Sequence, residues 1–389
     1  MAVHLSSSTS LVSSHLSPTI ATIHLSVLAH NLAELRRAIA PSCEILAIVK
    51  ADGYGHGSIV IAETLSQLGI TKFGVATIQE GVTLREAGLT GTIIVLGGIF
   101  SWQLRDLIHY GLTPVISDAS IAQQLGEELS TSQTPFPVHV KVDTGMRRLG
   151  IPIETLPDVL DSPLFRGPLI LESLMTHLAD ADNTDSTFTL QQLAQFQSAA
   201  KQLRSKGIPI PSLHAANTAG IVSYPQSHFD MVRPGLLLYG YQPTSSSTIT
   251  MPLDLKPVLT LSTKVVQTRT VAAGDPLSYN GAYRTTQSSR IAILPIGYAH
   301  GYNRLLSNTG QALIGNTRVS IVGKICMDMT LINITNVPEA QVGDSVVLLG
   351  SQGTDTISAM DIANWQESIP YEVLCSIGPR VNRVYEPLS

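Results

Sequence analysis

Several strand-like apolar runs of the sequence end in a polar side chain that could take part in catalysis. The run that opens EILAIVKADGYGHG, residues 44–57, ends at Lys50, and Tyr54 follows it among glycines. Similar runs are followed by residues 143–148, by His177, by Asn217 and Thr218, and by Arg233. A lysine at a strand end usually extends its amine into water along the surface, and a histidine there is usually structural. The joint occurrence of these groups, three of them cationic or able to become so, instead indicates one chemical site.

An amine in such surroundings has a specific chemistry. Burial and neighbouring positive charges both oppose protonation of a lysine, so they predict a lowered pKa for Lys50. A neutral lysine forms a Schiff base with an aldehyde, and pyridoxal phosphate (PLP) is the obvious aldehyde cofactor. PLP also requires a phosphate site, a partner for its ring nitrogen and a group near its phenolic oxygen. Glycine-rich backbone and hydroxyl groups would provide the first of these.

These side chains must be positioned by strands, and eight strand-like runs occur between residues 44 and 240. The runs are EILAIVK, KFGVAT, TIIVLG, TPVIS, PVHVKVD, LESLMTH, SLHAAN and DMVRPG. They recur roughly every 26 residues, close to the length of one β/α unit, and amphipathic stretches such as SIVIAETLSQLG and LQQLAQFQSAAKQLRSKG lie between them. This pattern predicts an α/β fold, a (β/α)8 TIM-type barrel with its active site at the carboxyl ends of the strands. The periodicity alone leaves a doubly wound parallel sheet open.

The pattern changes at residues 242–252, QPTSSSTITMP, which are typical of a linker. The later segments LTLSTKVVQTRTV, RIAILPIG, RVSIVGKICMDMTLINIT and DSVVLLG alternate Val and Ile with polar residues and glycine turns. They predict a mainly β C-terminal domain, either a barrel or a sandwich. We therefore predict a mobile tail at residues 1–18, a barrel domain at residues 19–245 and a β-rich domain at residues 246–389.

The composition restricts the class of protein. The 389 residues are 44% hydrophobic and 14% charged, as in a compact globular protein. The net charge of −5, without a dense run of Lys or Arg, argues against binding to nucleic acid or to an anionic membrane. Three cysteines fit neither a disulfide framework nor a zinc site, so we expect a cytoplasmic protein without a metal centre. The uncharged residues 87–104 contain four glycines and predict a buried strand between turns, not a membrane helix.

Nine segments, taken in order, resemble the alanine racemase family of PLP-dependent isomerases (fold type III). They are VKADGYGHG, KVDTGMRRLG, MTHLADAD, HAANTAG, VRPGLLLYG, LSYNGAY, LPIGYAHGY, GKICMDMT and YEVLC. The resemblance runs from about residue 20 to the end of the chain. It implies a barrel followed by a β domain, and a homodimer with shared active sites. It also implies interconversion of L- and D-alanine, which would supply D-alanine for peptidoglycan.

The resemblance also implies roles for individual residues. Lys50 would hold PLP and act as one catalytic base, and Tyr279, reaching the site from the partner subunit, would be the second. The residues that would bind the cofactor are Lys50, Tyr54, Arg148, His177, Asn217, Thr218, Arg233, Gly235, Leu236 and Tyr371. Arg148 and the backbone of Met327 would hold the substrate carboxylate. Supporting roles would belong to Lys141 (carbamylated in many members of the family), His214, Asp328 and Tyr298.

Two bases suit racemisation, because the α-proton leaves one face of the substrate and another arrives on the opposite face. Lysine and tyrosine both have ordinary pKa values near 10, so surrounding cations would have to favour neutral Lys50 and anionic Tyr279. Arg233 would donate to the ring nitrogen without protonating it, since arginine does not give up its proton. The cofactor would then be a weaker electron sink, which disfavours decarboxylation and transamination.

Three departures and three alternatives accompany this interpretation. Thr218, Asn280 and His300 stand where serine, glycine and an acidic residue are usual in the family. A decarboxylase of the same architecture would carry an acidic residue at the position of Arg233, and a PLP carrier without turnover would lack the β domain. The pocket implied by Tyr279, Tyr371 and Met327 is tight, which suits alanine. A racemase of serine or another small amino acid is the remaining alternative, because excluding one extra heavy atom is worth only a few kcal/mol.

Overall fold

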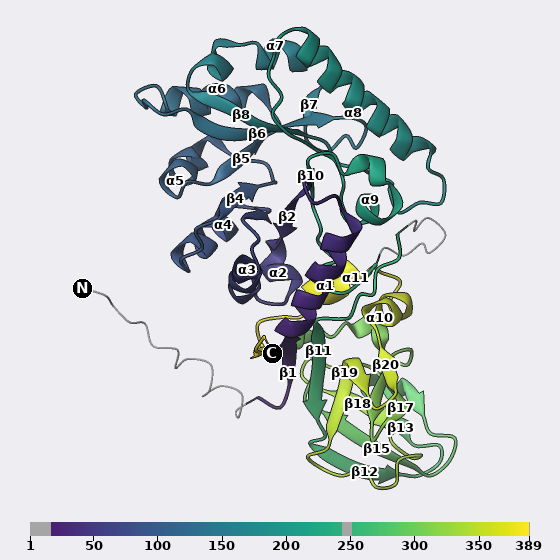
Figure 1. Cartoon of the computed structure of the whole chain (residues 1–389). Helices are drawn as coiled ribbons and strands as arrows, with labels where there is room; N and C mark the ends of the chain where they lie inside the picture. Colours follow the sequence, from purple (N-terminus) through teal and green to yellow (C-terminus); the bar gives the residue numbers. More distant parts are fainter. Residues whose placement is uncertain (1–16, 243–250, 389) are drawn as a thin grey trace, which may run out of the picture. The chain divides into compact units, whose positions relative to one another are not determined.

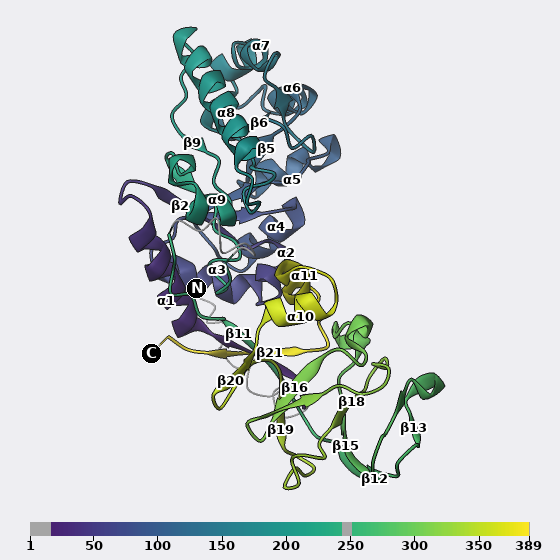
Figure 2. The ribbon, with the colours of Figure 1, turned by 90° about the vertical axis from the view of Figure 1, so that its right-hand side faces the viewer.

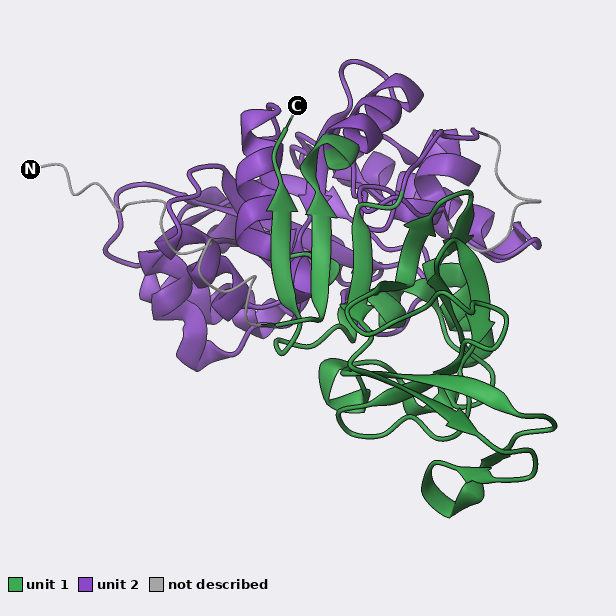
Figure 3. Ribbon diagram, turned by 90° about the horizontal axis from the view of Figure 1, so that it is seen from below, with its two compact units in different colours: residues 1–28, 54–57, 257–389 green, residues 29–53, 58–256 purple. Residues whose placement is uncertain are grey.

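The computed structural model describes residues 17–242 and 251–388 of the chain. Most of the predicted tail, residues 1–18, and most of the predicted linker, residues 242–252, lie outside the described residues. The chain divides into two compact units, which Figure 3 distinguishes by colour. The barrel unit comprises residues 29–53 and 58–256. The β unit comprises residues 1–28, 54–57 and 257–389.

Eight parallel strands form the barrel unit, and they follow one another around the sheet in chain order. They are β2 (Glu44–Ile48), β3 (Lys72–Val75), β4 (Thr92–Val95), β5 (Thr113–Ile116), β6 (Phe136–Asp143), β8 (Leu169–Met175), β9 (Leu213–His214) and β10 (Met231–Val232), with the short β7 (Ile151–Pro152) beside β6. The last strand, β10, pairs in parallel with the first, β2. The N–H groups of Asp230 and Arg233 donate to the carbonyls of Leu213 and Ala216, at 3.1 and 3.0 Å, and so bring β10 to β9. The predicted barrel is confirmed as a nearly closed ring, and the doubly wound alternative is wrong because its strand order reverses from the middle of the sheet, whereas these strands follow chain order and the last pairs with the first.

Helices lie between the strands in sequence and outside them in space (Figure 1). They are α1 (Leu25–Ala38), α3 (Ser58–Gln67), α4 (Ile78–Glu86), α5 (Leu104–His109), α6 (Ala119–Glu128), α7 (Leu156–Leu160), α8 (Thr187–Ser205) and α9 (Thr218–Ser223), with 3₁₀ turns at Ser101–Gln103, Pro163–Arg166 and Pro225–Ser227. The segment labelled α2 (Lys50–Tyr54) follows β2 and has a left-handed backbone. Helix α8 shows why the helices form. Its buried residues recur at helical spacing, and Gly207, at φ 79°, follows its end.

The β unit contains a larger sheet and two small ones, and the predicted mainly β second domain is confirmed. The larger sheet runs β17 (Thr317–Ser320), β16 (Gln311–Ile314), β19 (Ser345–Gln352), β11 (Leu259–Lys264), β1 (Ile20–His24), β21 (Asn382–Glu386), with β20 (Asp355–Ile357) beside β19. The small sheets consist of β12 (Gln267–Val271), β15 (Ser289–Leu294) and β18 (Thr330–Asn333), and of β13 (Pro276–Leu277) and β14 (Tyr283–Arg284). Further 3₁₀ turns span Tyr279–Gly281, Tyr298–His300 and Arg304–Leu306. Helices α10 (Ala359–Trp365) and α11 (Pro370–Cys375) lie side by side (Figure 2).

Residues 17–242 and 251–388 contain no candidate for a membrane-spanning helix. None of the helices described there combines the length and the apolar character needed to cross a bilayer.

Candidate active site

The predicted site residues of the barrel unit meet at one rim of the barrel. Lys50 follows β2, Asp143 ends β6, His177 follows β8, Asn217 follows β9 and Arg233 follows β10. The carboxyl ends of parallel barrel strands share one face, so these residues are neighbours although the chain separates them.

The cationic groups of the rim act on His177. Burial lowers the pKa of His177 well below its usual value, and the positive charges of Arg233, Lys141, Arg148 and Lys50 lower it further. His177 is therefore neutral at physiological pH, and it accepts or donates hydrogen bonds without adding charge.

The backbone after Lys50 forms a left-handed turn. The φ angles of Ala51, Asp52, Gly53 and Tyr54 are 51°, 52°, 61° and 53°. Each residue other than glycine costs about 1–2 kcal/mol in this region, so the surrounding structure must hold the turn in place. The Asp52 carboxylate accepts from the N–H of Ser58 at 2.8 Å, where helix α3 begins.

The turn that carries Arg148 is organised by Asp143. Its Oδ1 accepts from the N–H groups of Gly145 and Arg147 at 2.9 and 3.1 Å. Gly150, at φ 135°, closes the turn where a Cβ atom would lie 2.7 Å from the nitrogen of Asp143. Arg148 is exposed, and its charge lowers the pKa of the buried Lys141 in β6.

Lys141 lies within β6 and is only 4% exposed. Burial, then the charges of Arg148 and Arg233, lower its pKa to about 8, against the weaker opposing effect of Asp143. Burial and cationic neighbours, which predict a lowered pKa for Lys50, thus lower the pKa of this second lysine of the rim.

Arg233 is buried and fixed by a network of hydrogen bonds. Its Nη2 donates to the carbonyls of Thr176 and Ala215, both at 2.8 Å, and lies 3.2 Å from His177 Nδ1. Its Nη1 donates to Nδ1 of His214 at 3.0 Å. Burial lowers the pKa of Arg233 to about 9, which still leaves the guanidinium protonated at neutral pH. Within the described residues its Nε–H meets no acceptor, so one donor of the fork is available to a ligand.

A chain of neutral histidines continues this network, and the sequence did not point to its far end. Because Arg233 donates to Nδ1 of His214, the proton of that ring lies on Nε2, which donates to Nδ1 of His139 at 3.1 Å. Nε2 of His139 then faces the Glu172 carboxylate at 3.7 Å. Burial, the largest cause in both cases, lowers the pKa of both histidines, so the chain fixes the orientation of Arg233 without further positive charge.

Hydrogen-bond donors suited to a phosphate follow β9 and β10. Asn217 caps α9, its Oδ1 accepting from Gly220 N–H at 2.9 Å. Thr218 Oγ1 accepts from Gly235 N–H at 3.3 Å, which leaves the hydroxyl proton for another acceptor. The backbone of Leu236 follows directly. The threonine that replaces the usual serine therefore still carries a hydroxyl donor.

The remaining cofactor-binding candidates, Tyr54 and Tyr371, belong to the β unit. Their rings lie 5.9 Å apart. Burial raises the pKa of Tyr54, and the neighbouring Tyr371 and Cys375 raise it further, so Tyr54 stays a protonated phenol that can donate. The segment after Tyr54 is held by Arg383, whose Nε donates to the carbonyl of Gly55 at 3.1 Å.

A second group of predicted residues lies together on the β unit. Tyr279, Met327 and Asp328 line an open cavity of about 790 Å³, and Tyr279 is 67% exposed and Met327 52%. Asp328 pairs with Arg380 at 2.6 Å. Tyr298 is likewise exposed. Tyr279 and Met327 thus place two large, largely exposed side chains at this cavity.

Two departures from the family pattern on the β unit have structural explanations. Asn280, at φ 62°, adopts the left-handed conformation that glycine and asparagine share. His300 Nδ1 accepts from the N–H of Gly297 at 3.3 Å and so closes the turn it belongs to.

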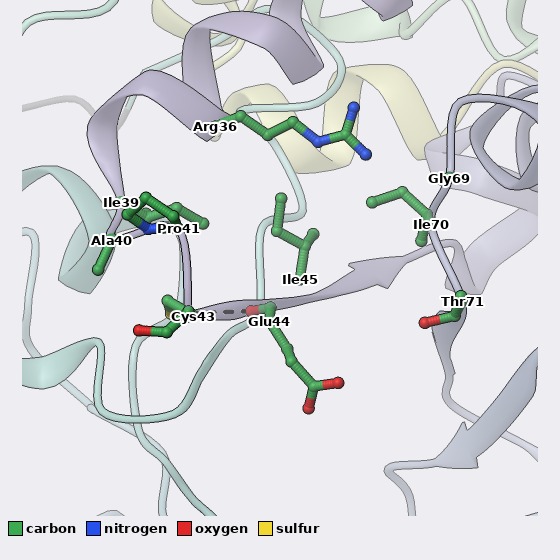
Figure 4. A pocket seen from close by; sticks show the side chains of 11 residues that line it. Arg36, Ile39, Ala40, Pro41, Cys43, Glu44, Ile45, Gly69, Ile70 and Thr71 are labelled. Carbon is green, nitrogen blue, oxygen red and sulfur yellow. Dashed lines mark hydrogen bonds between the residues drawn. The ribbon is translucent and has the colours of Figure 1, made fainter.

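A different cavity of the barrel unit lies at the amino ends of β2 and β3 (Figure 4). It has a volume of about 440 Å³, and its charged side chains are already paired within the unit. Arg36 donates to the carbonyl of Leu68 at 2.7 Å, and Glu44 binds Lys72 at 2.6 Å. This end of a barrel contributes to stability and not to catalysis, so the cavity is a poor candidate for the reaction.

Sequence reasoning also missed Gln192, a buried residue of α8 that fixes two rim loops. Its Oε1 accepts from Ala179 N–H at 2.8 Å, and its Nε2 donates to the carbonyl of His177 at 3.1 Å and to Thr144 Oγ1 at 3.2 Å. The sequence contains one indication of this role: Gln192 occupies a position of the α8 helical repeat that is otherwise mainly apolar.

Comparisons with known proteins cover nearly the whole chain. The models "Alanine racemase, N-terminal domain" and "Alanine racemase, C-terminal domain" match residues 23–243 and 258–385. An alanine racemase of Halothermothrix orenii is 41% identical over 369 residues, covering 95% of this chain and 97% of the relative. A solved alanine racemase of Clostridium difficile 630 is similar with a TM-score of 0.89 and 33% identity, covering 95% of this chain and 96% of that one. An alanine racemase from Bartonella henselae with covalently bound pyridoxal phosphate has a TM-score of 0.86 and 31% identity, over 95% of this chain and 100% of that one.

Proposed function

The chain belongs to the alanine racemase family, a family of PLP-dependent isomerases, and on this premise we propose that it interconverts L-alanine and D-alanine with PLP as its cofactor. The observation that carries the proposal is the set of cations around neutral His177 at the barrel rim: Lys50, Lys141, Arg148 and Arg233. Such a site attracts a phosphate and a carboxylate, and it opposes protonation of the amines within it.

The donor groups of the barrel unit fit PLP. The Thr218 hydroxyl and the backbone of Gly235 and Leu236 would bind the phosphate. Arg148 would lie at the phenolic oxygen. When bound, PLP supplies an aldehyde for the Lys50 amine and a ring that withdraws electrons from the α-carbon of the substrate.

Arg233 determines which reaction such a site favours. Its guanidinium is a permanent donor, held in place by His214, and it has an Nε–H available for a ring nitrogen. A donor that keeps its proton leaves the ring nitrogen neutral and weakens the withdrawal of electrons. Proton return at the α-carbon is then favoured over transamination, as racemisation requires.

The proton transfers would be divided between two side chains. Lys50 would remove or return the α-proton on one face, and Tyr279 of the partner subunit would act on the other. The exposure of Tyr279 and Met327 on one surface of the β unit supports this division, because an exposed apolar surface is suited to being covered by a second copy of the chain.

One preparation tests cofactor and reaction together. The purified protein should be yellow, reduction with borohydride should leave a pyridoxyl group on the Lys50 peptide, and a chiral assay should show conversion of alanine in both directions. Serine serves as the competing substrate, and Lys50→Ala as the control. A colourless protein that leaves both enantiomers of alanine unchanged after incubation with PLP would refute the proposal.

A homodimer with shared sites has its own test. Lys50→Ala and Tyr279→Ala chains should each be inactive, and mixing them after dissociation should restore about a quarter of the wild-type activity, since half of the dimers would then contain one intact site. No recovery in a mixture that demonstrably forms mixed dimers would place both bases in the same chain.

A cytoplasmic location is proposed on the cysteine content. The three cysteines, Cys43, Cys326 and Cys375, are not joined in disulfides. Fractionation of cells that express the full chain, followed by immunoblotting, would test this location.

A further inference from the structure

The backbone on both sides of Lys50 is tied to the β3–α4 segment. Before it, Val49 N–H donates to the carbonyl of Gly74 at 2.9 Å. After it, Ala51 N–H donates to Oε1 of Glu80 at 2.7 Å. The second bond is made inside the strained left-handed turn, where a carboxylate replaces the backbone partner that regular structure would provide.

The two oxygens of Glu80 have different partners. Oε1 accepts from Ala51, whereas Oε2 accepts from the N–H groups of Ala76 and Thr77, at 2.7 and 3.2 Å. Thr77 Oγ1 in turn accepts from Glu80 N–H at 3.2 Å, which completes a capping box at the start of α4. Glutamine serves a capping box as well as glutamate does, so the cap alone does not require two acceptor oxygens.

The bond to Ala51 is what distinguishes this residue from an ordinary helix cap. It joins two loops of the same rim, and the loop that it holds begins at the lysine. A turn of several left-handed residues persists only when its surroundings determine it. A charged acceptor is suited to this, because hydrogen bonds to charged groups are stronger than neutral ones.

We infer that Glu80 is a positioning residue for Lys50: through the Ala51 N–H it holds the left-handed turn that sets the direction of the Lys50 amine. The inference rests on the proposed function in that Lys50 is taken as the residue that reacts with the aldehyde. Glu80 touches neither substrate nor cofactor in this role.

Glu80→Gln separates the two roles of the side chain. Two backbone donors converge on Oε2 and one on Oε1, so the single carbonyl oxygen of glutamine should take the Oε2 position. Its NH2 group would then face the Ala51 N–H, and this bond alone would be lost. Thr77→Ala is the matched control, because it weakens the same cap and leaves the bond to Ala51 intact.

The measurement is the rate at which apo-protein acquires a borohydride-stable pyridoxyl group on the Lys50 peptide, over a series of pH values with PLP as the probe. Thermal unfolding of each apo-protein is recorded alongside. Glu80→Gln should slow the reaction about tenfold, equivalent to about 1.4 kcal/mol, at all pH values. Thr77→Ala should stay within about twofold of the wild type, as expected for a change away from the site. A helix cap without the positioning role would affect unfolding in Thr77→Ala alone and the labelling rate in neither variant.

Three results overturn the inference. One is an unchanged rate in Glu80→Gln. Another is an equal slowing in the two variants. The third, for a Glu80→Gln chain that fails to fold, is a Glu80→Ala protein that folds and labels at the wild-type rate. Absence of labelling at Lys50 in the wild type is a different outcome, and it refutes the proposed function itself.

Discussion

The lowered pKa of Lys141 predicts that this lysine reacts with carbon dioxide at neutral pH. Only a neutral amine forms a carbamate. With a pKa of about 8 in place of the usual 10.5, the neutral fraction at pH 7 rises from about 0.03% to about 9%, a change of about 300-fold. The product is an anion placed beside Arg148 and Arg233, where a cation stood before. The positive charge that lowers the pKa therefore also stabilises the modified side chain.

The same shift predicts how stability depends on pH in the unmodified protein. The folded state binds the Lys141 proton less tightly than the unfolded state, so stability rises with pH between about 8 and 10.5. Below pH 8 the full penalty applies, at most about 3 kcal/mol. Lys141→Met removes the charge in a side chain of similar length. In CO2-free buffer this variant should be more stable than the wild type at pH 7, and the difference should shrink as the pH rises towards 10.5.

Two assays test these expectations. Carbon-13 NMR of protein equilibrated with labelled bicarbonate should show a carbamate resonance in the wild type and none in Lys141→Met. Urea unfolding at pH 7 and at pH 10 gives the stability difference. The reasoning is refuted if saturating bicarbonate produces no resonance and the stability gain of Lys141→Met is the same at both pH values.

Three further predictions concern the bases, the reaction and the rim. Tyr279→Phe should abolish racemisation in both directions while PLP stays bound, because each direction needs both bases, and exchange of the α-proton in D2O should persist with only one of the two enantiomers; retained racemisation would contradict the two-base proposal. Arg233→Glu should lower racemisation and increase transamination, measured as pyruvate formation; faster racemisation without pyruvate would contradict the role of Arg233. Gln192→Leu should lower the free energy of unfolding by about 1–3 kcal/mol, because Ala179 N–H loses its acceptor. The exposed neighbour in Gln191→Leu should have little effect, and equal urea midpoints for the two variants would count against this.

The barrel was predictable because its signal is local. Each strand is a short apolar run, each run is followed by a helix, and the repeat length matches one β/α unit. The polar groups at the rim were predictable for the same reason, since a residue such as Lys50 or Arg233 directly follows its strand.

Pairing between distant segments was not predictable in this way. Strand β1, Ile20–His24, pairs with β11 and β21, whose residues lie more than 230 positions away, as in Ile20 with Ser262. Five residues of mixed character give no indication of such partners. Glu80 is a similar case: the sequence shows a helix start at Thr77, but the contact with Ala51 exists only once two β/α units pack together.

The charge of the barrel rim connects folding, cofactor and substrate. Asp143 is the acidic group that opposes the lowered pKa of Lys141, yet its carboxylate is engaged by the turn, through Gly145, Arg147 and an ion pair to Arg147 at 3.6 Å. The histidines of the rim are neutral, so they do not compensate the charge of the cations. The cations are thus compensated only when an anion arrives, and the carbamate of Lys141, the phosphate of PLP and the carboxylate of alanine would each supply one. Each of these anions should therefore stabilise the folded state of the apo-protein. Before an anion arrives, the repulsion between the cations favours the neutral, reactive form of the amines at the rim.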